Sequence, residues 1–271
     1  TVVGNTITFS DATTGDVNVA VGKKSLTDLT TGASNVAVGK DAAANITTGD
    51  SNTAIGQGAL TTQTTVSNNT AVGKSALTAN TTGYNNASVG AFSLLSNTTG
   101  GFNTAVGKDA LAANTTASNN TAVGTDALTT NITGNDNTAV GKEALALNTG
   151  GSNTAVGNET LESNTTGTRN TAVGALAADA SATANDVTAI GYQALTANTD
   201  SGSNNTAVGS YALSNNTTGS ENTAMGKAAL GDSTTGAYLT AVGSGAMAAA
   251  VTGNSNTAIG YQALTSNTTG T

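Results

Sequence analysis

The stretch NTAVGKDAL at residues 103–111, closed by the polar corner NTT at residues 114–116, is repeated with small changes along the chain. Its glycine recurs in phase at Gly22, Gly39, Gly56, Gly73, Gly90, Gly107, Gly124, Gly141, Gly157, Gly174, Gly191, Gly209, Gly226, Gly243 and Gly260. Consecutive positions differ by 17, except for 16 between Gly141 and Gly157 and 18 between Gly191 and Gly209. Such a short, strict period is typical of a solenoid, whose repeats bury their apolar faces only by stacking. We therefore predict an all-β protein, a parallel β-solenoid (β-roll) of about fifteen 17-residue rungs.

The composition differs from that of an average globular domain and argues against several classes of function. Charged residues make up 9% of the 271 residues, against roughly 25% in a typical domain. Abundant Gly, Ser, Thr and Asn are also typical of disordered polymers, but here the apolar positions are phased and proline is absent. The net charge of −8, with scattered basic residues, argues against nucleic-acid binding. The longest apolar run, residues 246–251, is far shorter than the ~20 residues of a membrane span.

The repeat register divides the chain into two parts. Residues 1–17 are the least regular, although Ile7 and Phe9 alternate with threonines as in a half-buried strand. We expect a degenerate first rung or a cap there, because terminal solenoid repeats are usually atypical. Residues 18–271 form the β-solenoid repeat array. The chain begins without methionine and stops just after a corner, so we expect a processed product or a piece of a longer protein.

Two apolar rows are candidates for the core. The residue before each glycine is Val, Ile or Met, and the fourth residue after it is usually Leu. An alanine row precedes the valine row, and these two rows point to opposite sides because successive strand residues alternate. An alanine row suits either a thin coil interior or tight contact with a partner chain. We assign the structural core rows to Val106, Val123, Val140, Leu111, Leu128 and Leu145.

The remaining regular positions of a rung have structural interpretations. An asparagine four residues before the glycine forms a row that we interpret as an amide ladder between rungs, with glycan contact as the alternative. Residues 108–113 are rich in helix formers but short, so we expect one tight helical turn or a second short strand. The ladder is represented by Asn86, Asn103, Asn120 and Asn137, and the rung-closing glycines by Gly90, Gly107, Gly124 and Gly141.

Residues suited to catalysis or ligand chemistry are sparse. Histidine and cysteine are absent and carboxylates are scattered, so we expect no enzyme activity, cofactor or metal site. The Gly-Lys-Ser triplet at residues 73–75 ends like a phosphate loop, but Asn68 replaces the first glycine of that motif. The Asn-Asp-Asn triplet at residues 135–137 suggests a metal site, although a solvated turn explains it better. Threonine-rich corners suggest ice binding, yet the side chains of consecutive residues such as Thr115 and Thr116 should not share a flat face.

The energetics favour association of chains. One Val and one Leu per rung bury little apolar surface relative to the entropy cost of ordering the whole rung. Backbone ladders and stacking supply part of the difference. Several coils packed about a common axis would bury a second apolar row, so we expect a homo-oligomer.

The strands NVAVG at residues 35–39 and NTAIG at residues 256–260 resemble the head repeats of trimeric autotransporter adhesins. In that family, NSVAIG motifs build a left-handed parallel β-roll, and three chains associate along its length. The similarity covers residues 18–270, although the family's repeat is shorter than the one in this chain and its strand has one more residue between Asn and Gly. The longer repeat with its NTTG corner resembles repeats of bacteriophage tail fibres and of large surface proteins of aquatic bacteria. The resemblance implies a trimeric, rod-like shaft that is extracellular or carried on a virion.

These observations lead to one principal hypothesis and several alternatives. The chain is expected to be the structural shaft or head of an extracellular adhesin or phage tail fibre, a homotrimer that presents a binding tip and contacts surface glycans. One alternative is a self-assembling extracellular filament, since open rungs are sheet edges able to template addition. The other is an ice- or glycan-binding solenoid. The expected partners are copies of the chain itself and cell-surface glycans, with no nucleic acid and no membrane span.

Overall fold

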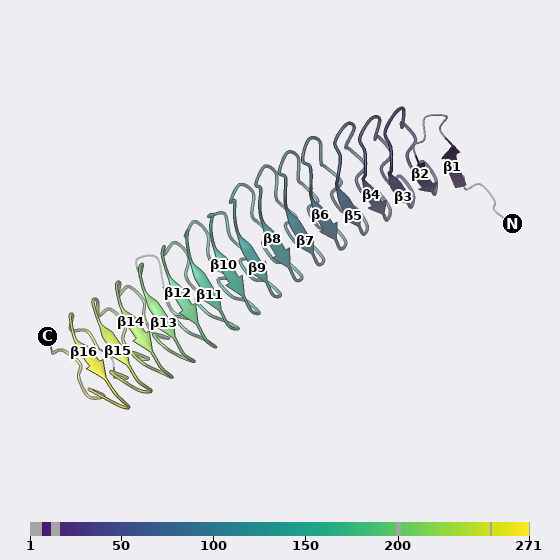
Figure 1. Ribbon diagram of the computed structural model, residues 1–271. Helices are drawn as coiled ribbons and strands as arrows, with labels where there is room; N and C mark the ends of the chain where they lie inside the picture. Colours follow the sequence, from purple (N-terminus) through teal and green to yellow (C-terminus); the bar gives the residue numbers. More distant parts are fainter. Residues whose placement is uncertain (1–6, 12–16, 199–201, 250, 271) are drawn as a thin grey trace. The chain divides into compact units, whose positions relative to one another are not determined.

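The computed structural model describes residues 7–11, 17–198, 202–249 and 251–270, and these form an all-β parallel β-solenoid without any helix (Figure 1). Internal contacts divide the chain into a first unit, Thr1–Asn135, and a second unit, Asp136–Thr271. Each strand from β2 to β16 marks one rung, in agreement with the number of repeats expected from the sequence. Among the described residues, none lies in a helix long and apolar enough to cross a membrane.

The strands are short and occur once per rung. Most consist of the three residues that precede the rung-closing glycine, usually Thr-Ala-Val. The first unit contains β1 (Ile7–Asp11), β2 (Val17–Val21), β3 (Val36–Val38), β4 (Thr53–Ile55), β5 (Thr70–Val72), β6 (Ala87–Val89), β7 (Thr104–Val106) and β8 (Thr121–Val123). The second unit contains β9 (Thr138–Val140), β10 (Thr154–Val156), β11 (Thr171–Val173), β12 (Thr188–Ile190), β13 (Thr206–Val208), β14 (Thr223–Met225), β15 (Thr240–Val242) and β16 (Thr257–Ile259).

Within each unit, consecutive rungs pair in parallel with like residues in register. In β7 and β8, for example, Thr104 lies beside Thr121 and Val106 beside Val123. The shorter repeat before β10 and the longer one before β13 keep the same register, because Ala155 pairs with Ala139 and Ala207 with Ala189. The extra or missing residue is therefore absorbed outside the strand.

Strand β1 does not continue the parallel stack. It pairs antiparallel with β2, with Ile7 beside Val21 and Asp11 beside Val17. The expectation of a degenerate first rung or a cap over residues 1–17 stays a prediction. Residues 1–6 and 12–16 lie outside the described residues.

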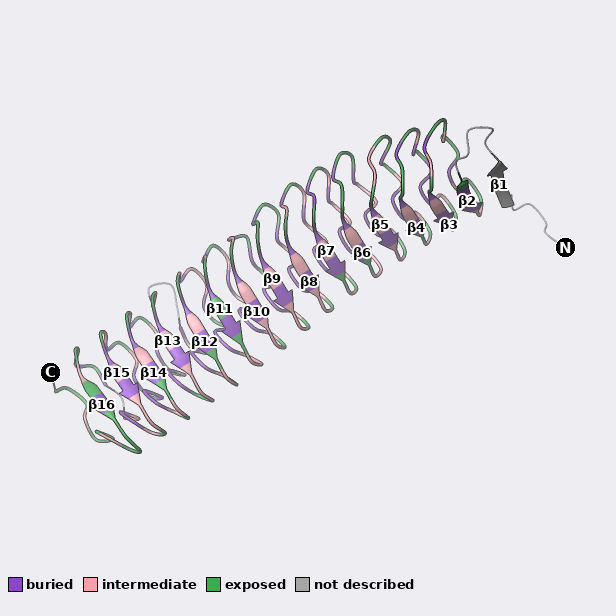
Figure 2. Ribbon diagram, viewed as in Figure 1, coloured by how far each residue is buried: buried purple, intermediate pink, exposed green. Residues whose placement is uncertain are grey.

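The core of each rung is thinner than the sequence predicted. In the inner rungs the middle residue of the strand, usually alanine, is buried, as are the residues that follow the glycine by three and four positions, usually alanine and leucine (Figure 2). In the rung of β7 these are Ala105, Ala110 and Leu111, each with no exposed surface. Ser88 and Ser93 replace the two alanines in the rung of β6, and their hydroxyl oxygens lie 2.6 Å apart. The two walls of the coil therefore touch through side chains of alanine size.

The assignment of the valine row to the core is wrong. Val106 is 38% exposed, whereas Val123 and Val140 are partly exposed, and all three lie on the outer side of the sheet. The leucine row lies inside, since Leu111, Leu128 and Leu145 are fully buried. The valines point outward because the gap between the walls is filled by alanine, and the alternation of a strand then sends the β-branched neighbours to the other face.

The segment after the glycine is neither the helical turn nor the second strand that was expected. Asp109 and Leu111 adopt left-handed conformations, with φ of 56° and 51°. Instead of bonding within one helical turn, the Leu111 amide donates to the carbonyl of Ala127 in the next rung at 3.0 Å. A left-handed residue costs about 1–2 kcal/mol, and complete burial of a leucine contributes about 1.5–3 kcal/mol. Burial of the leucine thus offsets its backbone conformation.

The rung-closing glycines are required for two reasons. Gly107 has φ of 139°, and a Cβ at this position would lie 2.4 Å from the carbonyl oxygen of Gly124. Such a distance is shorter than any normal contact, and the neighbouring group is backbone, which cannot move aside without disturbing the stack.

We expect Gly107→Ala to destabilise the first unit by at least about 1–3 kcal/mol, the cost of a backbone conformation that is essentially restricted to glycine. Gly58→Ala is the matched control, since Gly58 also has positive φ, but the nearest atom to an added Cβ is 3.7 Å away. Thermal unfolding followed by circular dichroism should show a clearly lower midpoint for G107A than for G58A. Equal midpoints would contradict the close approach of the rungs.

Candidate functional site

The predicted asparagine ladder is buried inside the coil. The carboxamide oxygen of Asn86 accepts the backbone N–H of Asn103 at 3.0 Å, and Asn103 accepts that of Asn120 at the same distance. The side-chain nitrogen of Asn103 donates to the carbonyl of Ala117 at 2.8 Å. In the second unit Asn137 forms the same kind of bond with the N–H of Asn153, at 2.9 Å. Because these side chains are buried, they hold rungs together and are not accessible to a glycan.

A second asparagine ladder was not predicted from the sequence. Its members lie seven residues after the rung-closing glycine and include Asn80, Asn97, Asn114, Asn131, Asn148, Asn164, Asn198 and Asn216. Asn114 donates to Asn97 Oδ1 at 2.7 Å and to the carbonyl of Ala117 at 3.1 Å. That carbonyl therefore accepts from both ladders. Asparagine occupies this position in nine of the fifteen repeats, but turn chemistry explained the recurrence equally well before the burial of these side chains was known.

Replacing Asn103 by Asp tests whether the buried asparagine ladder contributes to stability. Asp keeps the acceptor for Asn120 but loses the donor to Ala117 and buries a charge, so we expect a loss of at least about 1–3 kcal/mol at neutral pH. Asn119→Asp is the control because Asn119 is exposed and Asp136 occupies the same rung position. Chemical unfolding should find N103D much less stable than N119D. An equal loss would contradict the ladder.

The corner threonines form a third set of bonds between rungs. Thr81 Oγ1 donates to the carbonyl of Thr98 at 2.8 Å, and Thr98 Oγ1 donates to that of Thr115 at 2.9 Å. The hydroxyl protons of this row are therefore used inside the protein. This row therefore offers no free threonine array, whereas the next threonines of the corners, such as Thr99 and Thr116, are exposed.

The outer face of the strands is uncharged and partly apolar. Each Thr-Ala-Val strand turns its alanine inward and its threonine and valine outward, and in-register pairing lines up like residues along each unit. The exposed apolar row includes Ile55, Val89, Val106, Val173, Ile190 and Met225, which are between 37% and 45% exposed. We call the threonines and apolar residues of these strands the sheet face. Contiguous apolar surface of this kind usually marks an interaction site.

Ionisable groups on neighbouring rungs interact strongly at two places in the second unit. Arg169 donates two hydrogen bonds to Asp186, both at 2.7 Å, which lowers the pKa of the Asp186 carboxyl. The pKa values of Asp179 and Glu162 are raised instead. The largest cause is partial burial, and repulsion from carboxylates such as Glu159 adds to it. No group of acidic residues in the described chain is arranged to hold a metal ion.

Because the pKa values of Asp179 and Asp186 are shifted in opposite directions, the two carboxylates have opposite effects on stability as the pH changes. A raised pKa in the folded state means that ionised Asp179 destabilises the fold above the ordinary carboxyl pKa of about 3.9. We therefore expect Asp179→Asn to raise the unfolding midpoint at pH 7, with the gain vanishing near about pH 3. Asp186→Asn should instead lower the midpoint slightly at pH 7, since a depressed pKa contributes stability that is lost as pH falls. Unfolding midpoints of both variants and of the parent chain should be measured across this pH range. The change in midpoint should be positive for Asp179→Asn and negative for Asp186→Asn at pH 7; changes of the same sign would contradict the assignment.

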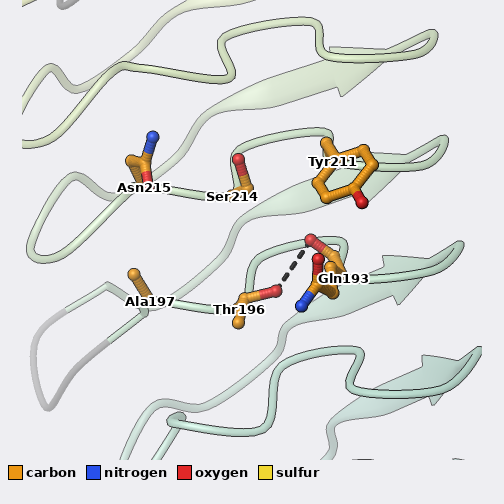
Figure 3. Close-up of a pocket in the computed structure, with 6 residues that line it drawn as sticks. All are labelled: Gln193, Thr196, Ala197, Tyr211, Ser214 and Asn215. Carbon is orange, nitrogen blue, oxygen red and sulfur yellow. Dashed lines mark hydrogen bonds between the residues drawn. The ribbon is translucent and has the colours of Figure 1, made fainter.

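The second unit contains a groove on its outer surface (Figure 3). The cavity has a volume of about 360 Å³ and is lined by Gln193, Thr196, Ala197, Tyr211, Ser214 and Asn215. These residues come from the turn segments that follow β12 and β13. We call this cavity the Tyr211 groove.

A related groove occurs in the first unit, with a volume of about 290 Å³. It is also formed by the segments after the rung-closing glycines, but its lining is charged: Lys24, Thr27, Asp28, Asp41, Ala44, Asn45 and Thr61. The fold thus supplies the groove, and the local sequence determines its chemistry.

The geometry defines the chain as a β-solenoid repeat protein. No protein-family model matches the sequence, and no curated protein matches it. The candidate functional surfaces are therefore the sheet face and the Tyr211 groove, judged by their own chemistry.

Proposed function

We propose that the chain is a structural segment, the shaft or head, of an extracellular adhesin or a phage tail fibre, and that three copies associate through the sheet face. The observation that carries this proposal is the exposed row of β-branched residues, with Val89 at 39% and Val106 at 38% in the first unit. Covering it would bury the second apolar row that a single thin coil leaves in water. The number of chains and the location outside the cell or on a virion rest on the resemblance of the repeats.

A structural role also agrees with the way stability is distributed. Each rung of a unit bonds to its neighbours through backbone, asparagine and threonine groups, so local contacts are repeated rather than concentrated around one centre. A chain built this way can be lengthened by adding repeats without redesigning the core. This property suits a spacer that holds a binding tip away from a surface.

Sedimentation equilibrium tests the association. A trimer should have three times the mass of the single 26.0 kDa chain. The double variant Val106→Lys and Val173→Lys places charges on the sheet face of each unit and should sediment as a monomer with an unchanged circular dichroism spectrum. Asn119→Lys is the control, because this position is exposed and Arg169 occupies it in another rung. A monomeric parent chain would contradict the proposal, and open polymers would favour the filament alternative.

Ice binding is a second candidate, supported by a threonine row other than that of the corners. Thr104 and Thr121 lie side by side on the sheet face, with Val106 and Val123 beside them. The result is a regular array with a strand spacing of about 4.8 Å. An ice-recrystallisation assay decides this candidate: strong inhibition that Thr104→Asp and Thr121→Asp together abolish would support it, and no inhibition by the parent chain would refute it.

A further inference from the structure

The Tyr211 groove combines a concave shape, an aromatic ring and an uncharged lining, whereas the related groove of the first unit is charged. None of its lining residues carries a formal charge, although the chain has a net charge of −8. Its volume of about 360 Å³ falls within the range of small-molecule sites, roughly 300–1,000 Å³. A ligand that fits it must therefore be neutral, because no lining residue would balance an ionic group.

Several hydrogen-bonding groups of the groove are available as acceptors. Thr196 Oγ1 donates to the carbonyl of Gln193 at 2.8 Å, as Figure 3 shows, and Ser214 Oγ donates to that of Gly231 at 3.2 Å. Asn215 Nδ2 donates to Asp232 Oδ1 at 2.9 Å. The two hydroxyl protons are therefore in use, so the oxygens of Thr196 and Ser214 are left as acceptors, and Asn215 Oδ1 is a further acceptor beside the second N–H of that amide. A good ligand consequently supplies several O–H donors.

The aromatic ring is exposed and held in a fixed orientation. Tyr211 is 40% exposed, and its ring meets that of Tyr192 edge to face, with centroids 5.5 Å apart and planes at 87°. Edge-to-face pairing stabilises the position of the ring and leaves surface free for a ligand. A fixed aromatic surface beside acceptor groups suits a molecule with C–H groups on one side and hydroxyl groups at its edge.

We propose that the Tyr211 groove binds a neutral oligosaccharide through stacking of a sugar ring on Tyr211 and hydrogen bonds from sugar hydroxyls to Thr196, Ser214 and Asn215. The Gln193 side chain can donate and accept at the rim of the same groove. The charged lining of the related groove in the first unit, with Lys24 and Asp28, shows that the neutral lining is not imposed by the fold. This inference goes beyond the structural role and does not depend on trimer formation.

Titration of the full chain with maltohexaose, cellohexaose and chitohexaose, followed by saturation-transfer NMR, tests the proposal. We expect at least one probe to bind with a dissociation constant of roughly 0.1–1 mM, as suits a shallow site. Tyr211→Ala should weaken that binding at least about tenfold, and Tyr211→Phe should retain most of it because the ring remains. Gln193→Ala should weaken it less than Tyr211→Ala.

The controls separate loss of the site from loss of the fold. Ala228 occupies the same rung position as Tyr211 with a similar φ, 53° against 61°, so alanine is compatible with the backbone there. Tyr238→Ala removes another exposed aromatic ring outside the groove and should leave binding unchanged. Dextran sulfate should bind more weakly than dextran. The proposal is overturned if no neutral probe binds, if Tyr211→Ala has no effect, or if the sulfated polymer binds better.

Discussion

Hydrogen bonding between successive rungs is the constraint on which the structure depends. A thin coil with walls of alanine has little apolar surface to bury, so its polar groups must be satisfied almost completely. The asparagine rows supply donors and acceptors that the backbone alone lacks, although in the second ladder Asn114 Oδ1, Asn164 Oδ1 and Asn216 Oδ1 are buried without a partner among the described residues. Asn103 accepts an amide of one neighbouring rung and donates to the carbonyl of Ala117, which also accepts from Asn114. Two ladders meeting at one carbonyl fix the spacing and the register of the rungs.

This arrangement explains which positions vary. The glycine that ends each strand is invariant in the repeats, because φ near 130–140° and the adjacent glycine carbonyl leave no room for a side chain, as at Gly107. The exposed positions after it carry residues as different as Lys108 and Tyr192. Function can therefore be placed on the outer segments with little effect on the stack. The charged groove near Lys24 and the neutral groove near Tyr211 illustrate this freedom.

The inward alanine and outward valine give the chain its potential for association. A coil with the valines turned inward would have buried the larger apolar row and left only alanines on the outer face of the strands. Here each unit retains an exposed apolar row, because the interior has room only for alanine and leucine. Association with further copies is one way to cover that row, and the strand residues of the sheet face carry no charge that would oppose it.

The sequence by itself determined the period, the solenoid class, the position of the strands and the rung-closing glycines, because these follow from a repeat that returns in phase. It also identified the asparagine row of Asn103 as a candidate ladder. The choice between Ala105 and Val106 as the inward residue was decided only by the tertiary structure, since alternation shows that they face opposite sides but not which side is inside. The left-handed segment at Asp109 and Leu111, the second ladder at Asn114 and the Tyr211 groove likewise depend on the neighbouring rung. Each arises from contacts between residues about one repeat apart, which local propensity cannot specify.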